Sequence, residues 1–212
     1  MTASVKICGL KTPETVAAAV EGGAAFIGLN FYPPSPRSVT PEVAAQISAR
    51  VPATVSKVAL VVDADDALID RIAEVLAPDI VQLHGKETPG RVREIKARTG
   101  RTVMKALSIA TSEDIARARV YEAVADFLMF DAKPPPGGLP GGNGLLFDWQ
   151  LLKDSRWSLP WFLAGGLTSA NVGEAIRATG ATRVDVSSGV ENAPGEKSPE
   201  KIRQFLAAAG RS

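Results

Sequence analysis

The single cysteine of the chain, Cys8, stands at the carboxyl end of the first apolar segment, in the run VKICGL, and is followed by Gly9. Because the 212 residues contain no second cysteine, Cys8 cannot form an intramolecular disulfide. In a repeated β/α architecture, residues at the carboxyl ends of strands face the active site. Most free cysteines are nevertheless small buried hydrophobic residues. Position alone favours that structural interpretation, so a catalytic thiol requires partner groups elsewhere in the chain.

A carboxylate with matching placement is Asp131, the last charged residue of the apolar segment DFLMFDA (126–132). Such a carboxylate could instead cap a following helix, but the proline-rich sequence after it disfavours a cap and favours general acid–base catalysis. Beside Cys8, strand alternation puts Lys6 on the same face as the thiol. If that face points into the protein, the Lys6 charge is expected to favour the Cys8 thiolate.

Other polar residues lie near the ends of later apolar segments. Gln82 and His84 share one face of the fourth segment, and Asp185 shares a face with Ser187 in the last. Lys105 in the fifth segment is expected to point inward as well. A single histidine is more often a hydrogen-bonded structural residue than a base. We therefore treat Gln82, His84 and Asp185 as candidate substrate-binding residues.

Two glycine-bearing turns late in the chain are suited to bind a phosphate. LAGGL (163–167) follows the seventh apolar segment, and SSGVE (187–191) follows the eighth. Backbone N–H groups of such turns, with the N-terminus of a short helix, bind phosphate in β/α barrels. Gly-Gly can also simply end a strand, but two turns in these places favour phosphate binding. The candidate residues are Gly165, Gly166, Ser187, Ser188 and Gly189, with Gly142 and Gly144 of the turn GGNG (141–144).

Two loops rich in proline and glycine interrupt the regular pattern, FYPPSPRSV (31–39) and DAKPPPGGLPGGNG (131–144). The second is longer than the roughly 12 residues of a plain connection, so we expect a functional lid or a disordered segment. In the first loop, Arg37 follows Pro36, which stiffens the backbone. A guanidinium held there could bind a planar carboxylate through two parallel hydrogen bonds, although a loop arginine is by default a solvated surface residue.

Eight apolar segments of strand length alternate with Ala-rich amphipathic segments, which predicts βαβ units and a parallel sheet. The apolar segments are residues 5–8, 25–31, 57–62, 79–84, 103–108, 126–132, 161–166 and 183–188. Helix N-termini are predicted by a hydroxyl residue followed by proline at Thr12, Thr40, Thr88 and Ser198, and helix ends by Gly22-Gly23, Gly100 and Gly180. The economical fold is one domain over residues 1–212, a closed (β/α)₈ TIM barrel without exposed sheet edges. A doubly wound open sheet is the alternative, but no GxGxxG follows the first strand.

The composition bounds the function. The 24 basic and 23 acidic residues form no basic stripe, so nucleic acid is not an expected partner. The apolar runs are too short to span a bilayer, and MTASVKICGL lacks the features of a signal peptide. One unpaired cysteine fits a reducing compartment, so we expect a cytoplasmic protein. The single histidine excludes a metal site built from several His or Cys ligands, though not one built from carboxylates.

In order along the chain, several motifs resemble those of the phosphoribosylanthranilate isomerase family over about residues 4–206. They are KICGL, GLNFYPPSPR, QLHG, LMFDA followed by GGNGLLFDW, FLAGGL and VDVSSGVE. That family consists of cofactor-free (β/α)₈ enzymes of tryptophan biosynthesis. One departure is Asn143, where the family commonly has Ser or Thr in the GGxG turn. The change leaves the backbone donors in place and can alter only a side-chain hydrogen bond.

The resemblance implies that Cys8 is the general base, Asp131 the general acid, and Arg37 the partner of the anthranilate carboxylate. The implied reaction is an Amadori rearrangement of N-(5-phosphoribosyl)anthranilate. Asp131 donates a proton to the ring oxygen, the furanose opens to an iminium, and Cys8 removes the C2 proton to give an enolamine. Tautomerisation yields 1-(2-carboxyphenylamino)-1-deoxyribulose 5-phosphate. The resemblance implies a small phosphorylated substrate and no cofactor or metal; for oligomeric state we expect a monomer or a homodimer.

Two alternatives stay open at this level. A related sugar-phosphate barrel enzyme, such as the indole-forming synthase of the same pathway, is expected to rely on Lys and Glu at the strand ends, where this chain has Cys8 and Asp131. A catalytically silent barrel that binds a phosphorylated ligand need not keep both groups. Turnover of phosphoribosylanthranilate separates these possibilities.

Overall fold

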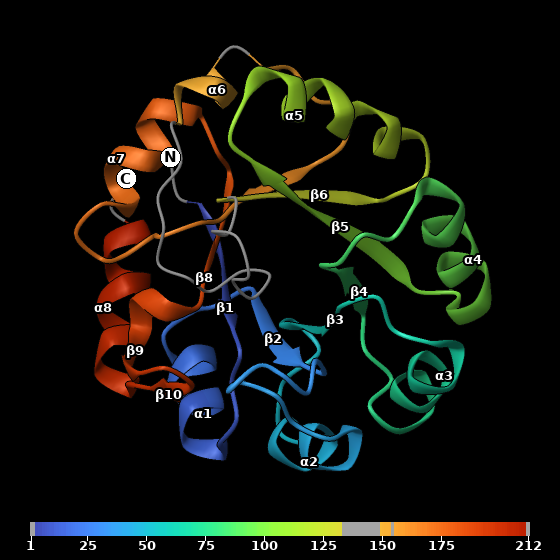
Figure 1. Cartoon of the computed structure of the whole chain (residues 1–212). Coiled ribbons are helices and arrows are strands. Elements are labelled where there is room, and N and C mark those ends of the chain that lie inside the picture. The colour runs from blue at the N-terminus through green and yellow to red at the C-terminus, as the bar shows by residue number, and fades with distance from the viewer. Residues whose placement is uncertain (1–2, 133–148, 154, 211–212) are drawn as a thin grey trace.

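The computed structural model describes residues 3–132, 149–153 and 155–210. Eight parallel strands close into a barrel in the order β1 to β8, and helices surround it (Figure 1). The strands are β1 (Ser4–Cys8), β2 (Phe26–Asn30), β3 (Ser56–Val61), β4 (Ile80–Leu83), β5 (Thr102–Ile109), β6 (Phe127–Ala132), β7 (Trp161–Leu163) and β8 (Arg183–Val186). The predicted closed barrel is therefore confirmed, and each strand overlaps the apolar segment that predicted it.

The helices follow the strands in alternation. They are α1 (Pro13–Glu21), α2 (Pro41–Ile47), α3 (Asp66–Val75), α4 (Pro89–Thr99), α5 (Ser112–Ala118), α6 (Gln150–Lys153), α7 (Val172–Thr179) and α8 (Pro199–Ala209), with short 3₁₀ helices η1 (Arg119–Ala123) and η2 (Ser188–Val190). No helix among the described residues is long and apolar enough to cross a membrane.

Local sequence signals set the helix ends as predicted. Each predicted N-cap side chain accepts a hydrogen bond from the backbone N–H three residues later, and a proline follows it; these residues are Thr12, Thr40, Thr88 and Ser198. Such a bond satisfies one of the unpaired N–H groups of the first turn. Gly100 and Gly180 end α4 and α7 with positive φ angles of 62° and 70°, a conformation that glycine adopts without strain.

Alternation along the strands divides the core into two layers. Inside the barrel, a compact cluster of buried apolar side chains consists of Val58, Ile80, Met104, Ala106, Met129, Phe162 and Ala164. A larger cluster packs the outer faces of the strands against the helices. The barrel is therefore a filled core, and polar groups that face inward at its carboxyl end must find partners there.

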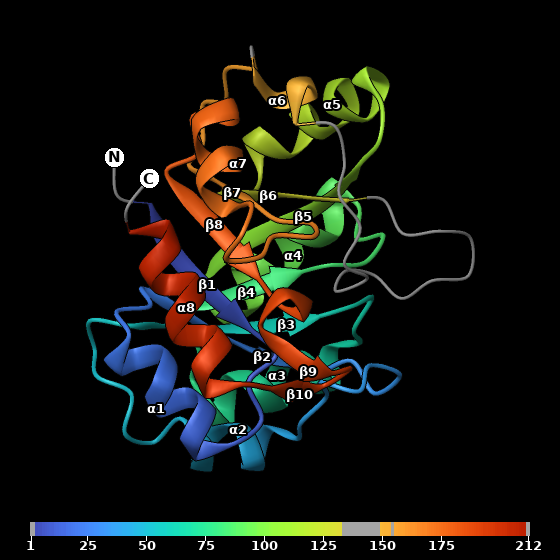
Figure 2. The ribbon, with the colours of Figure 1, turned by 90° about the vertical axis from the view of Figure 1, so that its left-hand side faces the viewer.

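A short antiparallel hairpin interrupts the β/α alternation between η2 and α8. It consists of β9 (Glu191–Ala193) and β10 (Glu196–Lys197). In the side view the hairpin lies beside the loop that joins β2 to α2 (Figure 2). The sequence pattern did not predict it, because two or three polar residues per strand carry no hydrophobic alternation.

Candidate active site

Cys8 and Lys6 both lie on the inward face of β1, as predicted, and both are buried. Lys6 Nζ lies 2.7 Å from Asp185 Oδ1 on the neighbouring strand β8, in a buried ion pair. An ideal Cβ built on Gly28 of β2 would lie 2.9 Å from Lys6 Nζ and 3.0 Å from Cys8 Sγ. The absence of a side chain at Gly28 therefore leaves the room in which the ammonium and the thiol lie together.

Burial decides the acidity of the thiol. It raises the pKa of Cys8 above its usual value, against the opposing charges of Lys6 and Lys197, and the Asp185 carboxylate raises it further. The Lys6 charge favours the Cys8 thiolate, as predicted, but the net change in pKa is a rise because desolvation of a thiolate in this core outweighs the nearby cations. Burial also lowers the pKa of Lys6, but Asp185 and Cys8 together bring it above its ordinary value. Lys6 thus stays protonated.

Asp131 ends β6 as a buried carboxyl group with both oxygens oriented. Its Oδ1 accepts a hydrogen bond of 2.8 Å from the backbone N–H of Ala132, and its Oδ2 lies 3.3 Å from His84 Nε2. His84 Nδ1 lies 3.0 Å from Gln82 Nε2. Because an amide nitrogen only donates, Nδ1 accepts, and the imidazole proton lies on Nε2, where it can donate to Asp131.

Gln82 is fully buried behind His84, and its Nε2 also lies 3.4 Å from Met129 Sδ. Strand alternation predicts that Gln82 and His84 share one face, and the structure brings them together with Asp131. The sequence does not indicate that the three residues lie in a row. Strand β4 carries Gln82 and His84 to a strand end two positions from Asp131 around the barrel, a relation that only barrel closure produces.

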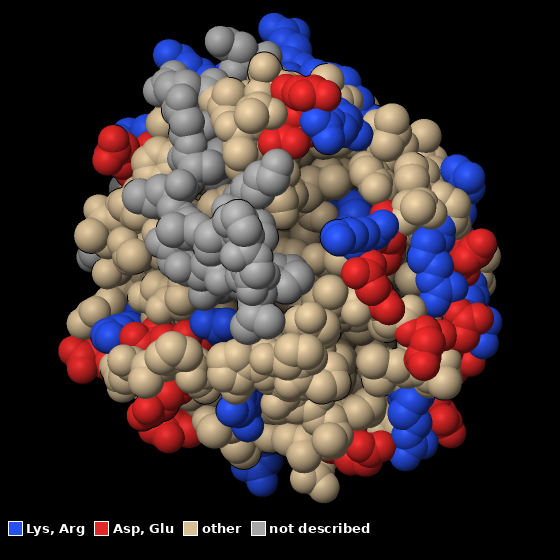
Figure 3. All heavy atoms as spheres, in the orientation of Figure 1, with Lys and Arg blue, Asp and Glu red and all other residues tan. Residues whose placement is uncertain are grey.

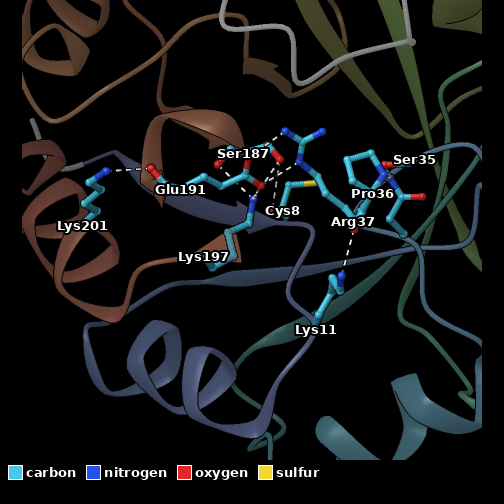
Figure 4. Close-up of polar contacts among 10 residues, drawn as sticks. Cys8, Lys11, Ser35, Pro36, Arg37, Ser187, Glu191, Lys197 and Lys201 are labelled. Carbon is cyan, nitrogen blue, oxygen red and sulfur yellow. Dashed lines mark hydrogen bonds and ion pairs between the residues drawn. The ribbon is translucent and has the colours of Figure 1, made fainter. Parts of the chain in front are cut away.

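Arg37 is a buried residue in this structure, and its default interpretation as a solvated loop arginine is wrong. Its Nε and Nη2 each donate a 2.8 Å hydrogen bond to the two carboxylate oxygens of Glu191. The aliphatic part of the side chain passes over Gly9, where an ideal Cβ would lie 2.8 Å from Arg37 Cδ. The guanidinium is consequently held beside Cys8 (Figure 4).

Two further buried charged groups, Glu191 and Lys197, lie beside Arg37, and the sequence does not indicate their role. Lys197 Nζ contacts Glu191 Oε1 at 2.5 Å, and it donates to the carbonyl and hydroxyl oxygens of Ser187 at 3.0 and 3.1 Å. The Ser187 hydroxyl in turn donates to the backbone carbonyl of Cys8 (Figure 4). Glu191 closes the motif SSGVE, so its position was visible, but nothing in the sequence indicated a contact with Arg37.

The two predicted phosphate turns touch each other. Gly165 and Gly166 follow β7 with positive φ angles of 86° and 62°. An ideal Cβ on Gly189 in η2 would lie 1.9 Å from the carbonyl oxygen of Leu167, so the backbones of the two turns are in close contact. The backbone N–H groups of Gly166, Ser188 and Gly189 have no acceptor among the described residues. Unpaired N–H groups in adjacent turns provide donors for an anion.

The third predicted turn cannot be compared in the same way, because Gly142 and Gly144 lie outside the described residues. The face of the molecule that carries the other candidates is hollowed near its centre and has charged side chains at its rim (Figure 3).

Lys105 does not point into the barrel, contrary to the expectation. Its neighbours Met104 and Ala106 belong to the inner cluster, so Lys105 faces the helices. Its Nζ contacts Glu87 Oε2 at 2.8 Å and donates to backbone carbonyls after β4. Both faces of a strand in a parallel barrel are apolar, so the alternation of residue types does not show which face of β5 points inward.

Comparison with known proteins covers the whole chain. A family model for N-(5'phosphoribosyl)anthranilate (PRA) isomerase matches residues 5–208. The N-(5'-phosphoribosyl)anthranilate isomerase of Parvibaculum lavamentivorans is 56% identical, and the match spans 100% of both chains. The crystal structure of phosphoribosyl anthranilate isomerase from Thermotoga maritima has 35% identity and a TM-score of 0.89, covering 99% of this chain and 100% of that one.

A further crystal structure is of a phosphoribosyl anthranilate isomerase in complex with reduced 1-(o-carboxyphenylamino)-1-deoxyribulose 5-phosphate. It is 34% identical, with a TM-score of 0.84, and covers 99% of this chain and 100% of that chain. The sequence motifs, the barrel, the family model, the relative and the solved structures therefore agree over nearly the whole chain.

Proposed function

The chain belongs to the N-(5'-phosphoribosyl)anthranilate isomerase family, and we propose that Cys8 is the general base and Asp131 the general acid of its isomerisation. The observation that carries the assignment is their placement. Both are buried, inward-facing groups at the carboxyl ends of β1 and β6, on the side where the two glycine turns follow β7 and β8. Two strands separate β1 from β6 on the shorter path around the barrel, so the two groups approach a bound sugar from different sides.

The chemistry begins at Asp131. Protonated Asp131 donates to the ring oxygen of the N-glycosylamine, the ring C–O bond breaks, and the nitrogen lone pair forms an iminium at C1. The hydrogen bond from Ala132 N–H to Oδ1 and the 3.3 Å contact between His84 Nε2 and Oδ2 hold the plane of the carboxyl group. This carboxyl group carries the proton that is transferred. Gln82, which is fully buried, acts through His84 rather than by touching the substrate.

Cys8 performs the second proton transfer. The iminium acidifies the C2–H bond, and the thiolate takes that proton. The C2–H bonding pair forms the C1–C2 double bond of the enolamine, and the C1=N π pair returns to nitrogen. Loss of the C2 hydroxyl proton and protonation of C1 complete the ketone. Because burial raises the pKa of Cys8, its thiolate is a stronger base than an exposed thiolate. The positive charges of Lys6 and Lys197 lower that pKa and so favour formation of the thiolate.

The remaining candidates bind the substrate. Arg37 receives the anthranilate carboxylate, and His84 and Asp185 face the sugar. The phosphate accepts hydrogen bonds from the turns that hold Gly165, Gly166, Ser187, Ser188 and Gly189, with Gly142 and Gly144 as further candidates. Family membership and the unpaired cysteine support a cytoplasmic location, and the protein is expected to be a monomer or a homodimer.

Turnover tests the proposal directly. Freshly prepared phosphoribosylanthranilate is added to the protein, and loss of the anthranilate fluorescence is followed with time. The wild type should consume the substrate, whereas Cys8→Ser and Asp131→Asn should not. A wild-type protein that binds a phosphorylated product analogue without turnover would instead support the silent binding barrel.

A further inference from the structure

The β9–β10 hairpin lies outside the eightfold β/α repeat, yet it carries two buried charges at the active site. Glu191 begins β9 and Lys197 ends β10, and at most 4% of either side chain is exposed. Burial of charges is costly unless they are paired and hydrogen-bonded. A purely connecting hairpin requires neither group, so their partners indicate what the hairpin does.

The hairpin contacts the loop that carries Arg37 at two points. Glu191 binds one edge of the guanidinium through two hydrogen bonds of 2.8 Å. At the tip, Gly195 has a φ of 82°, and an ideal Cβ there would lie 2.6 Å from the carbonyl oxygen of Pro36. Lys11 Nζ binds the same Pro36 oxygen at 2.9 Å from the other side (Figure 4). The backbone before Arg37 is thus packed closely against the hairpin.

Lys197 connects the same hairpin to the cysteine. It binds Glu191 and both oxygens of Ser187, and the Ser187 hydroxyl binds the Cys8 carbonyl. Arg37 and Lys197 lower the pKa of Glu191 despite the opposing effect of burial, so Glu191 is ionised. Burial lowers the pKa of Lys197, and the Glu191 carboxylate opposes that change. Arg37 and Lys197 therefore both bind the same carboxylate, and the three side chains form one buried cluster beside Cys8.

The contact with Glu191 fixes the orientation of the guanidinium. A guanidinium and a carboxylate can form two parallel hydrogen bonds, and such a pair holds both groups in one plane. Glu191 binds Nε and Nη2 in this way, so the plane and direction of the Arg37 guanidinium are set by the hairpin. An arginine without this brace would have to lose the freedom of a long side chain when the ligand binds.

We propose that Glu191 is a positioning residue that orients Arg37 for the substrate carboxylate, and that Lys197 holds Glu191 in place. The inference rests on the proposed role of Arg37 as the carboxylate partner. It assigns to the hairpin a part in substrate selection, whereas Glu191 itself touches neither the substrate nor the reacting atoms.

Binding of two matched ligands tests the inference. One is reduced 1-(o-carboxyphenylamino)-1-deoxyribulose 5-phosphate, and the other is the phenylamino compound that lacks the carboxylate. The ratio of their dissociation constants, measured by calorimetry, reports carboxylate recognition alone. Glu191→Gln keeps the shape of the side chain and removes its charge, and should reduce this ratio by about tenfold, the loss expected for one charged hydrogen-bond pair. The phenylamino compound should bind as it does to the wild type.

Two further variants distinguish a failure of the proposed role of Arg37 from a failure of the proposed role of Glu191. Arg37→Ala should bring the ratio of the two dissociation constants to about one, and adding Glu191→Gln to Arg37→Ala should not change the ratio further. If Arg37→Ala keeps the ratio, the proposed role of Arg37 fails. If Arg37→Ala abolishes the ratio but Glu191→Gln leaves it at the wild-type value, Arg37 stands and the positioning role of Glu191 is overturned.

A matched control and a second variant protect the result from folding effects. Glu196→Gln removes an exposed carboxylate from the same hairpin and should leave the ratio unchanged. Should Glu191→Gln fail to fold, Lys197→Met tests the same brace from the other partner and should also lower the ratio. Equal loss of affinity for both ligands in a folded variant would indicate general damage to the hairpin and would overturn carboxylate positioning.

Discussion

The two ends of the proposed proton path are built from different kinds of interaction. Cys8 lies among charges, with Lys6, Asp185 and Lys197 all affecting its pKa. Asp131 accepts a hydrogen bond from the backbone N–H of Ala132 and lies 3.3 Å from the His84 imidazole. A thiol must become charged to act as a base, whereas a carboxyl group must be neutral to act as an acid. Cations beside the thiol favour its charged form, whereas no lysine or arginine among the described residues stands beside Asp131 to favour a charged carboxylate in the same way.

Closure of the barrel brings together the groups around Cys8 (the charged end) and the groups around Asp131 (the neutral end). No lysine or arginine among the described residues pairs with Asp131, while Lys6 and Asp185 are adjacent in register on β1 and β8. The charged end should therefore respond to removal of a charge through the pKa of Cys8. The neutral end should respond to loss of orientation through kcat.

Removing either reacting group should have the largest effect. Cys8→Ser and Asp131→Asn should each lower kcat by roughly 10²–10⁴-fold, because each group performs one of two successive proton transfers. Both variants should still bind the reduced product analogue. The measurement is substrate fluorescence at saturating concentration. Near-normal kcat in Cys8→Ser would make the thiol a structural residue.

Lys6→Met should break the charged end alone. Burial already raises the pKa of Cys8, and Lys6 opposes that rise, so its removal should raise the pKa further. The rate of alkylation by iodoacetamide should then reach its midpoint at higher pH, and the acid limb of kcat/KM should move the same way. The fold should also lose about 3–5 kcal/mol, because Asp185 is left as a buried unpaired charge.

Lys105→Met is the matched control for Lys6→Met. It breaks another buried ion pair, with Glu87, but that pair lies outside the barrel core and is not among the groups that affect Cys8. It should lower thermal stability in a similar way and leave the pH dependence of alkylation unchanged. An equal shift of the Cys8 titration in both variants would show that loss of stability, not loss of the Lys6 charge, alters the thiol.

The positions of strands and helices could be predicted from sequence because their signals are local. The Thr-Pro pairs at Thr12 and Thr40 specify helix starts within three residues, and the apolar runs are continuous. The site partners could not be predicted, because Arg37 and Glu191 lie 154 positions apart and Lys6 and Asp185 lie 179 apart. Barrel closure brings the two residues of each pair together, and no local sequence signal at one residue indicates its partner.

The effect of burial on the pKa of Cys8 could not be predicted from the sequence either. Lys6 and Cys8 were expected on one inward face and are found there, but the sign of the Cys8 pKa change depends on how completely the thiol is buried. Composition shows that a core exists, but not which polar atoms lie at its edge. The balance between desolvation and nearby charge needs the packed structure.

Each end has a glycine that makes room for it, and the two should differ when replaced. An alanine at Gly165 would place Cβ 2.7 Å from the Ala132 nitrogen and 3.1 Å from Asp131 Oδ1, at a φ of 86°. Gly165→Ala should therefore lower stability by more than the roughly 1–2 kcal/mol of a left-handed non-glycine residue, and lower kcat too. Thermal unfolding and fluorescence turnover measure these losses.

Gly28→Ala is the counterpart at the charged end. Its Cβ would lie 2.9 Å from Lys6 Nζ, the far end of a side chain, and 3.0 Å from both Cys8 Cα and Cys8 Sγ, and its φ is not in the left-handed region. The stability loss should be smaller than in Gly165→Ala, while displacement of the ammonium should slow alkylation of Cys8. A larger loss of stability in Gly28→Ala than in Gly165→Ala would contradict this difference.

Removing the imidazole should have the smallest effect, and it should appear at the neutral end alone. His84→Ala removes the imidazole that lies 3.3 Å from Asp131 Oδ2 but leaves the hydrogen bond from Ala132, so the carboxyl group is loosened rather than lost. We expect about a tenfold fall in kcat, which corresponds to about 1.4 kcal/mol of lost orientation. His84→Gln retains an N–H donor and should recover part of it. In an Asp131→Asn background, His84→Ala should lower kcat almost no further, because the group that the imidazole orients is already inactive.

The pH profile of Cys8 alkylation should not change in His84→Ala, since His84 is not among the groups that affect the pKa of Cys8. A shifted Cys8 titration in His84→Ala would mean that the two ends are electrostatically coupled, and the division between a charged and a neutral end would fail.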